Sequence, residues 1–197
     1  MQRLLVLLVA GAVSGVCAAQ DAQPEMSPEA AAMMEAYVAA GKPGVHHLKL
    51  VALVGDWKIT NSSWMEPGGE PIVSEGKARK AWDLDKRFLR EEISGVSPMG
   101  DYHGVGYLGY DNATEQYQGV WMSSMATGMI LYTGQLSADG KTLTCTGQEA
   151  DPASGAMLDF EMTIEIESMD KHTLTFWYLM PGDQKLKAFE MVHERQR

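Results

Sequence analysis

Gly55-Asp56-Trp57 marks the place where a helical pattern gives way to a long series of alternating residues. From this motif to the end of the chain, turn-forming residues recur about every dozen positions, a spacing typical of short strands joined by hairpins. The clearest segment is 157–167 (MLDFEMTIEIE), where apolar and polar side chains alternate with a period of two. The motif and the pattern after it predict an antiparallel sheet with one dry and one solvated face.

The alternating pattern occurs in about ten segments from this motif onward. About ten strands joined by hairpins are expected to close into an up-and-down barrel, because closure removes the exposed edges of the sheet. The predicted fold class is therefore mainly β: a single antiparallel up-and-down barrel of about ten strands with one or two N-terminal helices. The candidate strands are residues 57–65, 72–84, 88–95, 102–110, 117–123, 129–136, 142–149, 157–167, 173–180 and 185–194.

Two helices are expected before the first strand. Ser27-Pro28-Glu29 is a typical helix start, because serine caps the helix, proline suits its first turn and glutamate favours the positive end of its dipole. Gly41 and Pro43 end this helix, which can pack on the barrel or on a partner. A second, short helix is expected over residues 45–54. The first helix carries an apolar stripe of Ala30, Met33, Met34, Tyr37 and Val38.

The first residues predict a secretory signal peptide. Arg3 is followed by an apolar run over residues 4–13 and by small residues around Cys17-Ala18-Ala19, which indicates cleavage after Ala19. The run is too short for a membrane-spanning helix, which needs about 20 apolar residues. We therefore expect a secreted or periplasmic protein with no membrane insertion after cleavage. Its parts are the signal peptide (1–19), a leader and N-terminal helix (20–43) and the barrel domain (44–197).

The chain is acidic and, after cleavage, holds one cysteine. The formal net charge is −10 at pH 7, and loss of the positive charge of Arg3 with the signal peptide makes it −11. Because a negative surface repels phosphate groups, nucleic acid is not an expected partner, and anionic lipid surfaces are disfavoured. The remaining cysteine, Cys145, cannot form a disulfide within the chain. It alternates with Leu143 on a candidate strand, which predicts a buried and inert thiol.

An ordered series of short motifs runs through the barrel domain. The series is His47-x-x-Leu50-x-x-Leu53-x-Gly55-Asp56-Trp57, Trp64-Met65-x-Pro67-Gly68, Arg87-Phe88-Leu89, Gly104-x-Gly106-x-x-Gly109-Tyr110-Asp111, Tyr117-x-x-x-Trp121, Ser124-Met125-x-Thr127-Gly128, Asp151-Pro152-x-x-Gly155, and Glu190 with Arg195. Through it the chain resembles the bacterial domain of unknown function 1579 family, a calycin- or lipocalin-like β-barrel, over about residues 44–195. The family has no assigned reaction, so the resemblance implies a fold and no activity.

The resemblance also implies a structural pair of residues, and this chain departs from the family at one position. In calycin-type barrels the tryptophan of the Gly-x-Trp motif closes one barrel end, beneath a basic residue from the last strand. In this chain, the resemblance implies that Gly55 and Trp57 form the motif and that Arg195 is the basic residue. A guanidinium over an indole is a favourable cation–π contact. Two residues after Trp121, where the family usually carries an aspartate, this chain has Ser123. A site that uses that carboxylate in relatives is altered here.

Glu190 is the ionisable residue that the pattern singles out for function. It alternates with three apolar residues within 186–192, so its side chain is expected to point into an apolar face. A buried glutamate must be paired or neutral. Two interpretations are open: a structural ion pair with an arginine such as Arg87 or Arg90, or the polar anchor of a ligand cavity.

Aromatic and methionine side chains form a second candidate set. On alternating positions of a barrel such residues are normally core, but in an eight- to ten-stranded barrel they can line a ligand cavity. Methionine makes such a lining adaptable. With Glu190, the candidate ligand-binding residues are therefore Trp121, Tyr117, Tyr107, Tyr132 and Met122.

No metal, cofactor or catalytic residue is predicted. The five histidines lack the convergent spacing of a zinc site, and no serine or cysteine has a motif-placed histidine. Asp101 and His103 share a strand face and form the best local acid–base pair. His193 is expected at the barrel rim, with axial haem ligation as the alternative. Gly104-x-Gly106-x-x-Gly109 matches a dinucleotide fingerprint only formally, because no helix follows it.

Three functions are compatible with the pattern. The leading hypothesis is a secreted or periplasmic barrel that binds a small, mostly apolar molecule with Glu190 as its polar anchor. The second, less expected, is an enzyme in which Glu190 and the Asp101–His103 pair perform acid–base chemistry in one cleft. The third is a scaffold or interaction module that docks a partner on the stripe of the N-terminal helix. The sequence does not indicate an oligomeric state.

Overall fold

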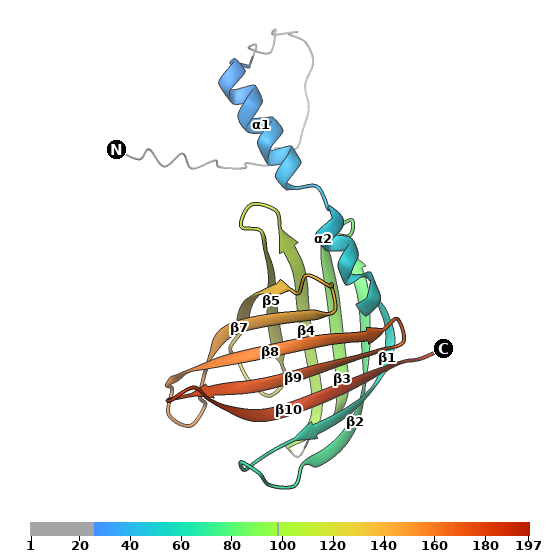
Figure 1. The fold of residues 1–197 in the computed structure, drawn as a ribbon, viewed down its shortest axis with the longest axis vertical. Helices are drawn as coiled ribbons and strands as arrows, with labels where there is room; N and C mark the ends of the chain where they lie inside the picture. Colours follow the sequence, from blue (N-terminus) through green and yellow to red (C-terminus); the bar gives the residue numbers. More distant parts are fainter. Residues whose placement is uncertain (1–25, 98) are drawn as a thin grey trace, which may run out of the picture.

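Ten antiparallel strands form a closed barrel in the computed structural model, which describes residues 26–97 and 99–197 (Figure 1). They are β1 (Gly55–Ser63), β2 (Ile72–Asp83), β3 (Phe88–Ser97), β4 (Gly100–Asp111), β5 (Gln116–Ser123), β6 (Ile130–Leu136), β7 (Thr142–Ala150), β8 (Met157–Ser168), β9 (Lys171–Met180) and β10 (Gln184–Arg195). Each strand pairs with its chain neighbours, and β10 pairs with β1. The predicted mainly β, up-and-down barrel is confirmed. The predicted signal peptide lies outside the described residues.

Side-chain alternation along the strands explains why the sheet closes around an apolar interior. On β8, Phe160, Met162 and Ile164 are all less than a tenth exposed. Between them, Glu161 forms an ion pair with Lys185 of the neighbouring β9–β10 hairpin, with 2.6 Å between Oε1 and Nζ. The period-two pattern that predicted this strand therefore separates the barrel interior from its outer surface.

Two short helices lie at one end of the barrel. α2 (Val45–Leu48) continues into the 3₁₀ helix η1 (Lys49–Leu53), which leads directly into β1 (Figure 1). Leu50 and Leu53 of η1 are 1% exposed and pack into the main core. The start of α2 is fixed by His47, whose Nδ1 accepts a hydrogen bond of 3.0 Å from the backbone N–H of Gly44. This helical segment closes the end of the barrel at which β1 begins.

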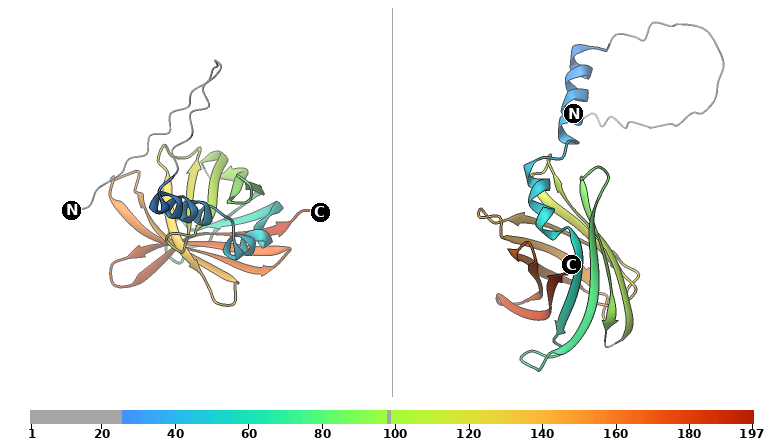
Figure 2. Two further views of the ribbon diagram at one scale, coloured as in Figure 1. Left: turned by 90° about the horizontal axis from the view of Figure 1, so that it is seen from above. Right: turned by 90° about the vertical axis from the view of Figure 1, so that its right-hand side faces the viewer.

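The N-terminal helix α1 (Pro28–Ala40) projects away from the strands (Figures 1 and 2). Its start is capped as predicted, because Ser27 Oγ accepts a hydrogen bond from the N–H of Ala30. None of its residues is buried, so its apolar stripe does not pack on the barrel. Arg87 and Asn112 donate hydrogen bonds to carbonyl groups at its C-terminal end. In the described part of the chain, no helix is long and apolar enough to span a membrane.

Trp57 is held between η1 and the last strand. It is completely buried, and its Nε1–H donates to the carbonyl of Leu53 at 3.0 Å. The guanidinium of Arg195 lies 4.2 Å from the Trp57 ring centroid and donates hydrogen bonds to three backbone carbonyls. Gly55 has φ of +142°, and a Cβ there would lie 2.1 Å from Arg195 Nη1. Gly55, Trp57 and Arg195 thus form one packed unit in which only glycine fits at the first position.

The interior of the barrel beneath η1 is filled by apolar side chains. Tyr117, Leu143 and Phe160 are 1% exposed, and Cys145 is completely buried in the same cluster. Burial raises the pKa of the Cys145 thiol to about 12, so the thiolate does not form near neutral pH. The prediction of a buried thiol is confirmed. Further along the barrel axis the packing opens into a cavity.

Candidate ligand-binding cavity

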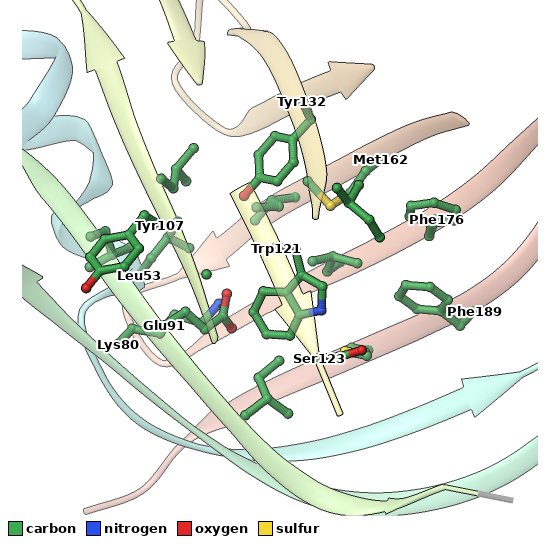
Figure 3. Close-up of a pocket in the computed structure, with 18 of the residues that line it drawn as sticks. Leu53, Lys80, Glu91, Tyr107, Trp121, Ser123, Tyr132, Met162, Phe176 and Phe189 are labelled. Carbon is green, nitrogen blue, oxygen red and sulfur yellow. The ribbon is translucent and has the colours of Figure 1, made fainter. Parts of the chain in front are cut away.

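A cavity of about 190 Å³ lies inside the barrel, below η1. Leu53 of η1 borders it at one end, and Trp121 and Ser123 of β5 border it further along the axis. Figure 3 shows Trp121 in the middle, with Phe176 and Phe189 on one side of it and Lys80 and Glu91 on the other. Most of the lining is aromatic or aliphatic and includes Ile93, Ile130, Phe160, Met162, Ile164 and Met191. The walls are therefore largely apolar, with polar groups at a few points.

Trp121 is seated against the glycines of β4. A Cβ at Gly104 would lie 2.2 Å from Trp121 Cζ2, and a Cβ at Gly106 would lie 2.5 Å from Cε3. The indole therefore needs a strand without side chains at these two positions. Its Nε1–H donates to the hydroxyl of Tyr102 at 3.0 Å. The Gly104-x-Gly106 spacing thus serves to place a tryptophan in the cavity, which agrees with the rejection of a dinucleotide site.

A buried polar cluster is centred on Lys80; Lys80 and Glu91 line the cavity, and His172 and His193 belong to the cluster without bordering the cavity. Its side chain is 2% exposed, and Nζ lies 3.0 Å from Glu91 Oε1 and 2.9 Å from His172 Nε2. Because an ammonium can only donate, the His172 Nε2 must be the acceptor, and the proton of the neutral ring is on Nδ1. His172 in turn stacks on His193, with 4.3 Å between ring centroids and 14° between planes. The edge of Trp57 packs on His172 at 4.3 Å.

Both histidines of this cluster are neutral near pH 7. Burial lowers the pKa of His172, and the neighbouring Lys80 ammonium lowers it further. The same two causes hold the pKa of His193 well below its ordinary value of 6.5. His193 Nδ1 lies 3.2 Å from the carbonyl of Met191, while its Nε2 lies 3.9 Å from Glu91 Oε1 and has no hydrogen-bond partner in the described part of the chain.

A second polar point on the cavity wall is Glu149 of β7. The hydroxyl of Tyr178 donates a hydrogen bond to Glu149 Oε1. Burial, together with this hydrogen bond to the carboxylate, raises the pKa of Tyr178, so its hydroxyl stays protonated and remains a donor. Tyr132 also borders the cavity, and burial raises the pKa of its hydroxyl. The cavity therefore offers hydroxyl donors, one ammonium and two carboxylates.

The motif series now has an independent match, since the family described as "Protein of unknown function (DUF1579)" matches residues 42–195. The chain belongs to this family. The resemblance drawn from the sequence motifs is confirmed. The crystal structure of Rv2717c from M. tuberculosis is similar to this DUF1579 protein with a TM-score of 0.56 and 16% identity, over 79% of this chain and 100% of that chain. At this identity the likeness shows the barrel fold alone.

A second solved structure is less similar to the DUF1579 protein. The S-type phycobiliprotein lyase CPES from Guillardia theta has 14% identity and a TM-score of 0.48, over 81% of this chain and 97% of that chain. At this TM-score the similarity supports no conclusion about function. No curated protein matches the chain.

Three of the aromatic residues predicted for the site border the cavity of the DUF1579 barrel: Trp121, Tyr132 and Tyr107. Tyr107 takes part only from the edge, because its ring is directed away from Trp121 in Figure 3 and its hydroxyl donates to Asp83 Oδ2 at 3.3 Å. Tyr117 and Met122 do not border the cavity. The hydroxyl of Tyr117 donates to the carbonyl of His46 at 3.0 Å, which places it in the packed helical end.

Glu190 does not point into the barrel of the DUF1579 protein, which corrects the expectation drawn from alternation. The register of β10 against β9 shifts between Lys187 and Phe189, and this bulge adds one residue to the strand. Beyond the bulge the phase is reversed, so that Phe189 and Met191 line the cavity. Glu190 lies on the other face, where its Oε2 is 2.5 Å from Lys187 Nζ. Its partner is thus a lysine three residues away rather than an arginine.

The proposed acid–base set of the enzymatic hypothesis does not converge. Asp101 and His103 are exposed on β4, and neither they nor Glu190 borders the interior cavity. His193, expected at the rim, is completely buried in the polar cluster. In the described residues, no group of three or more His, Cys, Asp and Glu side chains could hold a metal ion.

Lys80, Glu91, His172 and Glu149 were missed by the sequence reasoning. A signal existed for two of them. On β2, the residues two positions before and after Lys80 are apolar, and on β9 Leu174 lies two positions after His172. Residues two apart share a strand face, so both side chains are expected to point into the core. The same test that selected Glu190 would have selected them. It holds for Lys80 because no register shift occurs along β2, and for His172 because the shift beside it, between Ile166 and Ser168, adds its extra residue to β8 and not to β9.

Proposed function

We propose that this DUF1579 protein is an exported binding barrel that holds one small, mostly apolar molecule in its interior cavity. The observation that carries the proposal is the cavity of about 190 Å³ with apolar walls and a few polar groups. Binding sites for small molecules commonly combine such walls with a small number of convergent polar groups. The predicted signal peptide supports a location in the periplasm or outside the cell.

The volume of the cavity limits the size of the ligand. An engineered apolar cavity of about 150 Å³ in a protein core binds benzene. The slightly larger cavity of this barrel, about 190 Å³, therefore suits a single ring with a short substituent, or an aliphatic molecule of similar volume. A long acyl chain or a fused multi-ring pigment is larger than this cavity and would extend beyond it.

Lys80 gives this site a donor for the polar part of a ligand. Its ammonium has three N–H groups, of which one faces Glu91 and one His172. The third can donate to a ligand oxygen or nitrogen in the cavity. Because Lys80 is held by two partners, its position is set before the ligand arrives, and little ordering entropy is lost on binding.

Filling the cavity is expected to abolish ligand binding. In Ser123→Trp, a side chain on the lining is replaced by an indole that occupies the ligand volume. Leu131→Trp is the control, because Leu131 is 65% exposed on the neighbouring strand β6. Native mass spectrometry of each protein, purified gently from the envelope fraction of its host, is expected to show a stoichiometric added mass for wild type and Leu131→Trp and none for Ser123→Trp. A clean protein mass for wild type, or the same added mass on Ser123→Trp, would overturn the proposal.

A further inference from the structure

The charged side chains that line the cavity do not balance. They are Lys80, Glu91 and Glu149. Lys80 and Glu91 form an ion pair at 3.0 Å and neutralise each other. For Glu149, no basic side chain among the described residues lies within 4.0 Å, and its one hydrogen bond comes from the neutral hydroxyl of Tyr178. The cavity wall therefore carries one carboxylate without a counter-ion.

The Glu149 carboxylate can form an ion pair with a cation in the cavity. Because Glu149 is half-buried, its carboxylate is only partly hydrated, and an ion pair formed there is screened less than one on the open surface. Tyr178 supplies one hydrogen bond to Oε1, and Oε2 receives none from the described residues. A cationic group in the cavity would compensate the charge, and a neutral or anionic one would not.

The aromatic wall next to Glu149 suits the same kind of group. Tyr178 packs edge-on against Phe176, with 5.4 Å between ring centroids. Phe176 stacks with Phe160 at 4.7 Å and with Phe189 at 5.0 Å, and all three phenylalanines line the cavity. Ring faces carry negative electrostatic potential and attract ammonium groups; because Phe176 lies within the stack, Phe160 and Phe189 are the rings that can present a face to the ligand. The carboxylate and the ring cluster are joined through Tyr178, so both features act on one side of the cavity.

We propose that the ligand is a small organic amine in its cationic form, with the ammonium at Glu149 and the aromatic cluster. This inference rests on the proposed function, since it assigns a chemical class to the ligand of the same cavity. Lys80 repels a second cation, so the ammonium lies at the Glu149 side of the cavity, and the part of the ligand nearer Lys80 is uncharged and can include a hydrogen-bond acceptor. The site is thus selective for an amine over a neutral or acidic molecule of equal size.

Three probes of the same shape and different charge test this selectivity: benzylamine, benzyl alcohol and benzoate, titrated calorimetrically at pH 7. Wild type is expected to bind benzylamine most tightly. Glu149→Gln keeps an acceptor for Tyr178 but removes the charge, and we expect it to weaken benzylamine binding by about tenfold or more, with benzyl alcohol changed by less than about twofold. Glu165→Gln is the control, because Glu165 is exposed on the outer face of β8 and its replacement changes the net charge equally.

The outcomes separate this inference from the proposed function. Equal benzylamine affinity in wild type and Glu149→Gln overturns the amine inference, as does tighter binding of benzyl alcohol or benzoate by wild type. In those cases the cavity still binds a small molecule, and the proposed function stands. Binding of none of the three overturns the amine inference, and the host-derived mass on the wild-type protein then decides the proposed function separately.

Discussion

Replacement of Lys80 by methionine is expected to lower the free energy of unfolding by about 3–5 kcal/mol. Methionine fills a similar volume but removes the ammonium that lies 3.0 Å from Glu91 Oε1 and 2.9 Å from His172 Nε2. Lys80 is 3% exposed, and the methionine would occupy its place beside Glu91 without supplying a counter-ion. The loss follows from leaving the Glu91 carboxylate without its counter-ion and the His172 acceptor without its donor, which is more harmful than removing both partners together.

Urea unfolding of matched variants measures this effect. Lys58→Met removes an ion pair with Glu75 whose side chains are 47% and 68% exposed, and it is expected to change stability by less than about 1 kcal/mol. The double variant Lys80→Met/Glu91→Leu is expected to recover most of the loss, because no buried charge remains unpaired. An effect of Lys80→Met as small as that of Lys58→Met would show that the cluster is hydrated and does not stabilise the fold.

Acidification from pH 7 to pH 5 is expected to lower the free energy of unfolding by about 4 kcal/mol. Burial holds the pKa values of His172 and His193 well below 6.5 in the folded protein. Below pH 6.5 the unfolded chain therefore binds two protons that the folded chain does not, and stability is lost as the pH falls. Above pH 6.5 neither state is protonated and the contribution is fully present. Burial also lowers the pKa of His47, which adds to the effect in the same direction.

A series of urea unfolding curves between pH 7.5 and 5 tests this dependence. His193→Phe is expected to reduce the slope of stability against pH, because one of the two buried imidazoles is gone. His103→Gln replaces an exposed histidine and is expected to leave the slope unchanged. A stability that stays constant from pH 7 to pH 5 in wild type would contradict the burial of neutral imidazoles in this cluster.

The barrel could be predicted because its signals are local. Each strand is indicated by the alternation of apolar and polar residues, and each hairpin is indicated by turn-forming residues between two strands. Closure followed from the number of strands and the need to remove exposed edges. The pairing of Trp57 with Arg195 came from the family resemblance, and its geometry in the structure is a cation–π contact at 4.2 Å.

The candidate site could be predicted only in part, because its geometry depends on long-range register. The bulge at Ala188 reverses the phase of β10 and moves Glu190 to the outer face, and no residue in that strand marks the bulge. Lys80 and His172 are 92 positions apart in the chain and meet only when the barrel closes. Trp121 was found because aromatic residues on alternating strand positions are a local feature, whereas the glycines that make room for it lie on another strand.

A crystal structure of the protein purified gently from its host tests most directly whether the cavity binds a small molecule. We predict electron density for one molecule of about the size of a substituted ring, between Trp121 and the wall that carries Glu149, with the lining side chains where the structure places them. A barrel interior filled by its own side chains, with Trp121 or Met162 turned into the space and no density for a ligand, would contradict the proposed function.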